Sequence, residues 1–169
     1  MIKVLQERPE HIDTISSLTI KAFPSNAEAN LIDKLREKLT NFYSFVAIKD
    51  GEVIGHILFT PVYLDGPENN ISIFGLGPMA VLPKYQKSGV GSKLVRRSLK
   101  FLKKQEIDAV VVLGHKEYYS KFGFESSAKY GVKSEFDVPD DVFMIKFLNR
   151  DFKSILKGTI KYDELFSKV

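Results

Sequence analysis

Residues 86–91 combine two glycines with polar and basic neighbours in a pattern that suits a phosphate-bearing ligand. The segment reads Gln-Lys-Ser-Gly-Val-Gly, and it stands between an apolar strand-like stretch, 76–81, and a basic helical stretch that follows it. Glycines at a helix start let the backbone come close to a ligand, because no Cβ stands in the way. The first free N–H groups of the helix then point at the ligand, and the helix dipole favours an anion. The spacing therefore predicts a loop that binds a pyrophosphate.

Spacing separates the classes of protein that use glycines in this way. A Walker loop requires a Gly-Lys pair, which the sequence lacks. A dinucleotide fingerprint requires Gly-x-Gly-x-x-Gly directly after a strand. Here Leu94 stands where the third glycine should be, and residues 82–88 separate the expected strand end from Gly89. The remaining pattern is Gln/Arg-x-x-Gly-x-Gly/Ala, and residues 86–91 match it at each fixed position.

This last pattern resembles the acyl-CoA pyrophosphate loop of the GNAT family of N-acetyltransferases. In that family a bulged strand precedes the loop and pairs with the pantetheine arm, and residues 79–81 stand at the matching place. The family tends to carry an aromatic-Tyr-x-Lys/Arg-x-Gly-Phe element further on, and residues 118–124 read Tyr-Tyr-Ser-Lys-Phe-Gly-Phe. Between them the apolar run 109–113 takes the place of the family's fifth strand. The resemblance covers residues 40–125 best.

The resemblance implies a co-substrate and the residues that hold it. Acetyl-CoA is the expected acetyl donor, and no metal is expected. Many relatives place an Asn after the fifth strand, where this sequence has Gly114-His115-Lys116, so a contact from that Asn is not carried over. The residues expected to bind the cofactor are Met79, Ala80, Val81, Gln86, Lys87, Ser88, Gly89, Val90, Gly91 and Ser92.

Tyr119 is the candidate general acid, because the resemblance places it near the sulfur of CoA, where it would protonate the leaving thiolate. A thiol has a pKa near 8.5, and a tyrosine near 10 can donate to a thiolate as charge develops. The adjacent Tyr118 competes for the role. The structural alternative is an aromatic core residue on a short helix.

Glu28 is the candidate base, because in relatives the start of the second helix borders the acceptor site. A carboxylate in a first helical turn also complements the helix dipole, so the residue has a structural alternative. His115 or a chain of water molecules could remove the proton instead. The three histidines, His11, His56 and His115, lack metal-ligand spacing. His56 falls within an expected strand and is interpreted as a packed or partner-bonded residue.

Hydrophobic periodicity predicts the elements that position these residues. Asp50-Gly51 is a two-residue hairpin signal, and 65–70 is expected to be a turn. The helix after the glycine loop has an apolar stripe opposite a basic face, and with its flanking strands it forms a βαβ unit with parallel strands. Residues 126–141 are poorly patterned and are expected to form a long loop. Strands are predicted at 2–7, 42–48, 52–64, 71–81, 109–113, 143–148 and 158–162, and helices at 9–22 and 27–39.

The expected fold class is α/β, a single GNAT-like domain over residues 1–169. Its mixed, mostly antiparallel sheet is flanked by helices and has a central, splayed parallel strand pair. At 169 residues with 44% hydrophobic content, one domain with a sizeable core is expected. The absence of cysteine excludes disulfides and cysteine nucleophiles. No apolar run suits a membrane span and the N-terminus has no signal-peptide pattern, so a cytoplasmic protein is expected.

The charge distribution supports a phosphate-bearing ligand. The net charge is +4, but from Lys84 to Lys104 there are eight basic residues and no acidic one. The excess positive charge therefore gathers around the loop and its helix, which suits a ligand with several phosphates. A solvated helix face is the alternative for the distal lysines.

The predicted function is transfer of the acetyl group of acetyl-CoA to an amine by direct attack. A catalytically silent, CoA-binding regulatory domain is the alternative, and a nucleic-acid-binding module ranks last because no recognition-helix pattern is present. The expected partner is a small-molecule or peptide amine acceptor, whose identity the sequence does not reveal. Nucleic acid and membranes are not expected partners. The oligomeric state is left open, with a homodimer as one option.

Overall fold

The computed structural model describes residues 1–68, 70–149 and 156–168, so Asn69 of the expected turn lies outside the described residues. The chain forms two compact units. Unit 1 comprises Met1–Phe59, Gly77–Ser98 and Glu164–Val169, and unit 2 comprises Thr60–Leu76 and Leu99–Asp163. No helix in the described ranges is both long enough and apolar enough to cross a membrane.

Unit 1 contains an antiparallel meander. Its strand order begins with β1 (Ile2–Gln6), β2 (Tyr43–Lys49) and β3 (Glu52–Asp65), and continues with β4 (Ile73–Val81). β1 pairs with β2, and β2 with β3, both antiparallel. Asp50 and Gly51 both have positive φ, 50° and 79°, as a two-residue hairpin of this kind requires. The predicted hairpin is confirmed.

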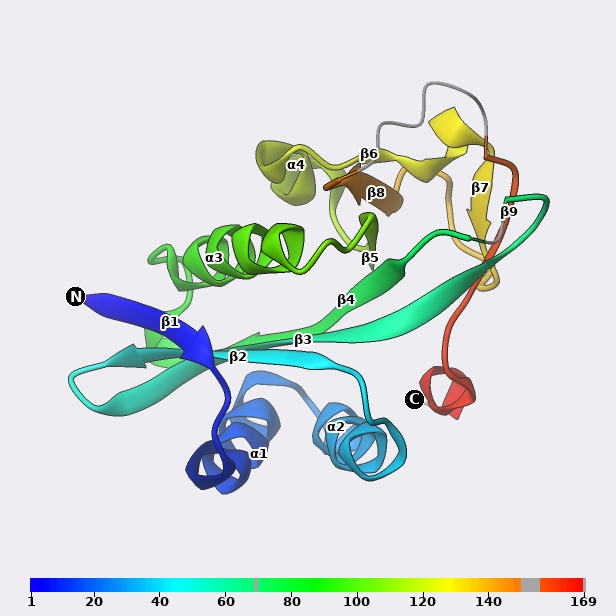
Figure 1. Cartoon of the computed structure of the whole chain (residues 1–169). Coiled ribbons are helices and arrows are strands. Elements are labelled where there is room, and N and C mark those ends of the chain that lie inside the picture. Colours follow the sequence, from blue (N-terminus) through cyan, green and yellow to red (C-terminus); the bar gives the residue numbers. More distant parts are fainter. Residues whose placement is uncertain (69, 150–155, 169) are drawn as a thin grey trace. The chain divides into compact units, whose positions relative to one another are not determined.

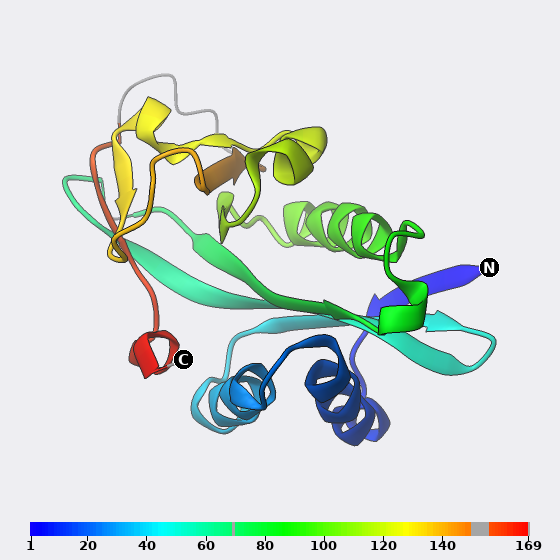
Figure 2. The same cartoon turned by 180° about the vertical axis from the view of Figure 1, so that it is seen from behind.

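Helices cover both faces of the strands in unit 1. Figures 1 and 2 show α1 (Ile12–Ala22) and α2 (Ala27–Lys38) on one face, and the start of α3 (Val90–Lys104) on the other. Gly55 of β3 lies under α3, and alternate strand residues face opposite sides of a sheet. On the other side α2 packs through a cluster made of Leu31, Ile32, Leu35 and Leu58. The C-terminal turn, Glu164–Lys168, packs against this cluster through Leu165 and Phe166.

Unit 2 contains the parallel pair that the sequence predicts. Residues Ile73–Leu76 of β4 pair in parallel with β5 (Ala109–Leu113), and the pairing ends at Leu76 and Val112 although β4 continues to Val81. β8 (Phe143–Phe147) pairs antiparallel with β5, and the short β6 (Glu125–Ser126) pairs with β8. The mixed, mostly antiparallel sheet and its β4–β5 parallel pair are therefore confirmed.

The expectation of a long loop at 126–141 is wrong over its first part. Ser127–Tyr130 forms a 3-10 turn, and β7 (Val132–Ser134) pairs in parallel with β9 (Gly158–Lys161). β9 in turn pairs with the end of β3 at Tyr63–Asp65. A three-residue strand is too short to show a period, and its partner lies far along the chain.

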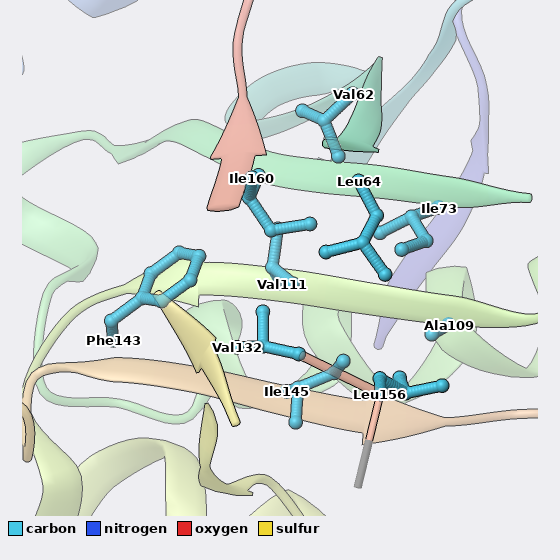
Figure 3. Close-up of a cluster of buried hydrophobic side chains, with 10 residues drawn as sticks. All are labelled: Val62, Leu64, Ile73, Ala109, Val111, Val132, Phe143, Ile145, Leu156 and Ile160. Carbon is cyan, nitrogen blue, oxygen red and sulfur yellow. The ribbon is translucent and has the colours of Figure 1, made fainter. Parts of the chain in front are cut away.

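The core of unit 2 is built from these strands. Figure 3 shows side chains of β5, β8 and β9 converging, with Val111, Ile145 and Ile160 almost wholly inaccessible to solvent. Val132 of β7 and Phe143 of β8 belong to the same buried cluster. Because β7 contributes to this core, the segment that follows it is anchored to the sheet.

Candidate active site

The glycine loop lies in unit 1, at the start of α3. Gly89 has φ of 91°, a left-handed conformation that favours glycine, and a Cβ built there would meet no atom within 4 Å. The N–H of Lys93 donates to the Gly89 oxygen at 3.1 Å. The N–H groups just before Lys93 thus stand at a helix end, where they have no intrahelical acceptor. This local structure is an exposed backbone cradle that an anion can occupy.

Side chains of the loop brace its own backbone. Gln86 donates through Nε2 to the Val81 oxygen at 3.0 Å, which ties the loop to the end of β4. The Ser88 hydroxyl donates to the carbonyl of Tyr85. Because that hydroxyl proton is engaged, the backbone N–H is the group of Ser88 that suits a phosphate contact.

The basic residues around the loop have different environments. Lys87 is exposed and makes no ion pair within the described residues. Lys84 lies 3.9 Å from the carboxylate of Glu52, and the Lys93 ammonium donates to the carbonyl of Ile2. Some of the basic residues around the loop therefore make contacts within the protein itself.

Gly55 is a glycine that positions the start of α3 and that the sequence reasoning missed. A Cβ at Gly55 would stand 3.0 Å from Leu94 Cδ1, 3.1 Å from Val90 Cγ1 and 3.3 Å from the Ala80 oxygen. The missing side chain lets the first turn of α3 approach β3 closely, which fixes where the helix start lies. A glycine inside a strand is the available signal, since such a residue often marks a close approach.

The strand before the loop contributes the rest of the expected cofactor-binding residues. Ala80 is buried, whereas Met79 and Val81 are half-buried. The N–H of Leu82 donates to the Ile54 oxygen at 2.9 Å, which ties the end of β4 to β3. Residues 79–92 are thus held together within unit 1.

Tyr119 lies in unit 2, at the end of the short helix α4 (Lys116–Tyr119). Its ring contacts Tyr118 edge-on at 5.0 Å and Phe124 at 5.7 Å between centroids. The side chain is 9% exposed, whereas Tyr118 is half-buried with Lys121 over its ring at 4.4 Å. Neither tyrosine hydroxyl makes a hydrogen bond within the part of the chain that the structure describes.

Gly114 sets the position of Tyr119. A Cβ at Gly114 would stand 2.3 Å from Cε2 and 2.7 Å from Cδ2 of the Tyr119 ring. Gly114 directly follows β5, so the ring packs on the carboxyl end of that strand.

Burial changes the acidity of Tyr119. It raises the pKa of the phenol to about 12, and the neighbouring Tyr118 adds to the shift. The phenol is therefore neutral, with its proton in place, throughout the neutral and moderately alkaline range.

Residues 122–124, which complete the aromatic element, pack in the core and form a turn. Phe122 and Phe124 are buried, and Gly123 ends the turn with φ of 91°. The interpretation of these three residues as packing and turn residues is confirmed.

Glu28 lies in the first turn of α2, in unit 1. Its Oε1 is buried and has no hydrogen-bond partner among the described residues. α2 covers the face of β3 opposite to α3, so Glu28 belongs to the helix that lies across the strands from the glycine loop.

His56 is partner-bonded, as expected, and belongs to a buried polar network. It contacts the Ser44 hydroxyl at 2.8 Å, and Ser44 donates to Glu7 at 2.7 Å. Glu7 also pairs with Arg36 of α2. Burial lowers the pKa of His56 to about 4. Burial acts to raise the pKa of Glu7, but the hydrogen bonds from Arg36 and Ser44 outweigh it and the net pKa is lowered.

The other histidines do not form a metal site. His115 is exposed and caps α4 with its backbone, since its oxygen accepts from the N–H groups of Tyr118 and Tyr119 at 3.1 Å each. Within residues 1–68, 70–149 and 156–168, no three His, Cys, Asp or Glu side chains are grouped as metal ligands.

The chain matches known acetyltransferases in sequence. Residues 4–127 match the GNAT acetyltransferase domain family. The uncharacterised N-acetyltransferase YhbS of Escherichia coli K12 is 33% identical over 163 residues, which is 96% of each chain. A second uncharacterised N-acetyltransferase of the same strain, YjhQ, is 34% identical over 130 residues, which covers 75% of this chain and 72% of the relative.

Solved structures agree with these matches. E. coli YhbS in complex with CoA superimposes with a TM-score of 0.89, covering 98% of this chain and 92% of that one at 33% identity. A GNAT acetyltransferase of Brucella melitensis in complex with acetyl-CoA gives 0.77 at 31% identity, covering 98% of both chains. The fold and the glycine loop define an acetyltransferase. The chain belongs to the GNAT family.

Proposed function

We propose that this chain transfers the acetyl group of acetyl-CoA to an amine, with the amine attacking the thioester directly. The chain is a GNAT-family N-acetyltransferase, and acetyl-CoA is its co-substrate. The observation that carries the proposal is the family match over residues 4–127, which includes both the glycine loop and Tyr119. Relatives of 33% and 31% identity that cover nearly the whole chain hold CoA and acetyl-CoA respectively, which supports the choice of donor.

The residues from Met79 to Ser92 hold the donor in this proposal. The N–H groups at the start of α3 bind the pyrophosphate, and Lys87 adds an exposed positive charge beside them. The backbone of β4 at 79–81 pairs with the pantetheine arm and its N–H groups polarise the thioester oxygen. Protein dipoles that are fixed before the reaction stabilise the developing oxyanion without a reorganisation cost.

Tyr119 stabilises the leaving group. A phenol with a pKa of about 12 is a weaker acid than a free thiol. Tyr119 therefore donates a hydrogen bond that holds the departing thiolate, and the proton lost by the attacking nitrogen ends on the sulfur. The neutral amine and acetyl-CoA thus give the amide and the CoA thiol.

Glu28 receives the acceptor's ammonium group before attack. Its buried Oε1 has no partner in the described structure, and a buried carboxylate oxygen without a partner is unfavourable. An ammonium group would supply the missing donor, and loss of its proton to Glu28 or to water yields the neutral nucleophile.

A direct assay tests the proposal. The protein is incubated with acetyl-CoA and a panel of primary amines, and free CoA thiol is measured with a thiol reagent. The chain contains no cysteine, so the protein itself gives no thiol signal. We expect thiol release that depends on an amine and matches the acetyl-amide formed. A protein that binds acetyl-CoA but acetylates no amine would be the silent regulatory domain instead.

Three further properties belong to the same proposal. We place the protein in the cytoplasm, treat residues 1–169 as one acetyltransferase domain and keep a homodimer as one option for its assembly. The acceptor is a small-molecule or peptide amine, and neither nucleic acid nor a membrane takes part.

A further inference from the structure

Tyr85 connects the glycine loop to the β2–β3 hairpin. It is the last residue of the 3-10 turn Pro83–Tyr85, which lies directly before the loop, and its side chain is half-buried. Figures 1 and 2 show this turn beside the hairpin. The turn, the loop at 86–91 and the hairpin all belong to unit 1, so their contacts lie within one compact unit.

The side chain of Tyr85 is held by the residues that flank the hairpin turn. Its hydroxyl donates to Oε1 of Glu52 at 3.3 Å, and the ammonium of Lys49 lies 5.4 Å from the centre of its ring. Lys49 and Glu52 are paired in the strand register, so both contacts come from the same end of the β2–β3 ladder. The ammonium of Lys84 lies 5.2 Å from the centre of the same ring.

These contacts differ in strength. A cation within about 6 Å of an aromatic ring is attracted to its face. The hydrogen bond to Glu52 is long, and the exposed Lys84–Glu52 pair at 3.9 Å contributes little. The aromatic ring of Tyr85 therefore matters more than its hydroxyl in linking the turn to the hairpin.

The backbone of Tyr85 holds the loop. Its carbonyl accepts the Ser88 hydroxyl, and its N–H donates to the Leu82 oxygen at 2.8 Å. Lys87 and Gly89 both have left-handed backbones, with φ of 60° and 91°. This conformation costs free energy at a residue other than glycine, so other contacts must hold the loop in it. The hydrogen bond between Tyr85 and Ser88 spans Lys87 and supplies such a contact.

We propose that Tyr85 is a positioning residue for the acetyl donor: the hairpin holds its ring, and its backbone holds the loop whose N–H groups bind the pyrophosphate. The inference rests on the proposed donor site and adds a residue that acts on it indirectly. A loop that is already ordered binds its ligand more tightly, because no ordering is needed on binding. Gly51 at the hairpin turn is not part of the link, since a Cβ there meets no atom within 4 Å.

Tyr85→Leu tests the inference, because it keeps an apolar side chain and removes both the ring and the hydroxyl. One weak hydrogen bond and two cation–ring contacts are lost, so the Kd of CoA measured by calorimetry should rise roughly five- to fiftyfold. The KM for acetyl-CoA should rise in parallel with kcat unchanged, as expected when only binding is affected. Tyr85→Phe keeps the ring and should stay within roughly threefold of the parent Kd.

A donor without phosphates separates positioning from general damage. S-Acetylpantetheine has the thioester and the pantetheine arm of acetyl-CoA but no phosphate, so the position of the loop does not affect its binding. Its kcat/KM should be the same for the parent and for Tyr85→Leu.

Two further variants serve as control and as independent test. Tyr43→Leu makes the same change at a half-buried tyrosine of unit 1, at the other end of β2 from the hairpin, and should leave the Kd of CoA near the parent value. Lys49→Met/Glu52→Ala removes the hairpin's side of the link without changing the net charge. It should weaken CoA binding in the same direction as Tyr85→Leu, and it leaves Tyr85 itself in place.

The outcomes separate this inference from the proposed function. Parent-like CoA affinity in Tyr85→Leu or in the double variant would overturn the inference. Equal losses with acetyl-CoA and S-acetylpantetheine, or equal weakening in Tyr43→Leu, would also overturn it, because they indicate general damage to unit 1. Calorimetry needs no turnover, so selective weakening of CoA binding in a protein that acetylates no amine would support the inference and count against the proposed function alone.

Discussion

At the scale of single residues, Tyr119 and Tyr118 are neighbours with different environments. Tyr119 is buried, packs on the end of β5 and has a raised pKa, whereas Tyr118 is half-buried. We expect Tyr119→Phe to lower kcat by about 10²–10³-fold, the scale of one donor to a developing negative charge, with little change in acetyl-CoA affinity. Tyr118→Phe is the matched control and should keep most of the activity. Steady-state kinetics check this, and a reversal between the two variants would assign the role to Tyr118.

The pH dependence of kcat tests the same assignment. With a pKa of about 12, Tyr119 keeps its proton throughout the neutral and moderately alkaline range. Loss of the Tyr119 proton should therefore produce no falling limb in kcat below about pH 11, whereas an unperturbed tyrosine would produce one near pH 10.

We expect Gly114 to affect catalysis through the position of Tyr119. Gly114→Ala would place a methyl group 2.3 Å from the tyrosine ring, so we expect the ring to move and kcat to fall. In a Tyr119→Phe background the same change should lower kcat much less, because the hydroxyl that it would misplace is already absent. Kinetics of the two single variants and the double variant measure this coupling. Strictly additive losses would mean that Gly114 affects the enzyme by another route.

The buried His56 network predicts an acid-sensitive fold. The His56 pKa falls from an ordinary 6.5 to about 4 on folding, so between these values the unfolded chain holds a proton that the folded chain lacks. Stability therefore rises with pH across this window, and by the linkage relation His56 contributes about 3 kcal/mol that is lost as pH falls from 6.5 to 4. The lowered pKa of Glu7 acts in the same direction below pH 4.5.

Denaturant unfolding at several pH values measures this effect. His56→Gln should reduce the slope of the free energy of unfolding against pH between pH 6.5 and 4, whatever its effect on stability at neutral pH. An unchanged slope in His56→Gln would contradict the assignment.

At the scale of elements, the glycine loop and the β2–β3 hairpin offer a matched pair. Gly89 and Gly51 both have positive φ, 91° and 79°, and both have open space around a built Cβ. A valine at either position should cost about 1–2 kcal/mol of stability through backbone strain. Only Gly89→Val should also weaken acetyl-CoA binding, because its side chain would occupy the space of the pyrophosphate.

Calorimetric titration of the two folded variants with acetyl-CoA distinguishes strain from occlusion. Gly51→Val should bind as the parent does. Equal weakening in both variants would mean that general destabilisation, and not the loop, lowers the affinity.

At the scale of the whole molecule, three elements run through both compact units: β3, β4 and α3. Ligand binding to any of them is therefore coupled to folding of the chain. At a hundredfold excess over its Kd, acetyl-CoA should stabilise the protein by about 2.7 kcal/mol. This corresponds to roughly 5–10 °C in Tm for a chain of this size. Thermal unfolding measures the shift, NAD is the control, and a larger shift with NAD would favour the dinucleotide interpretation.

The sequence by itself determined those features that depend on neighbouring residues. The strands, the amphipathic α3 and the Asp50-Gly51 hairpin follow from periods and turn residues, which are local properties. The glycine loop and the residues of 118–124 identified the family through spacing along the chain.

Only the tertiary structure decided contacts between residues that lie far apart in the sequence. The β7–β9 pairing, the packing of Gly114 on Tyr119 and the partners of His56 leave no local signal. Such contacts form because they bury apolar surface or make hydrogen bonds. Residues at any separation along the chain can make them, so they have no fixed spacing in the sequence.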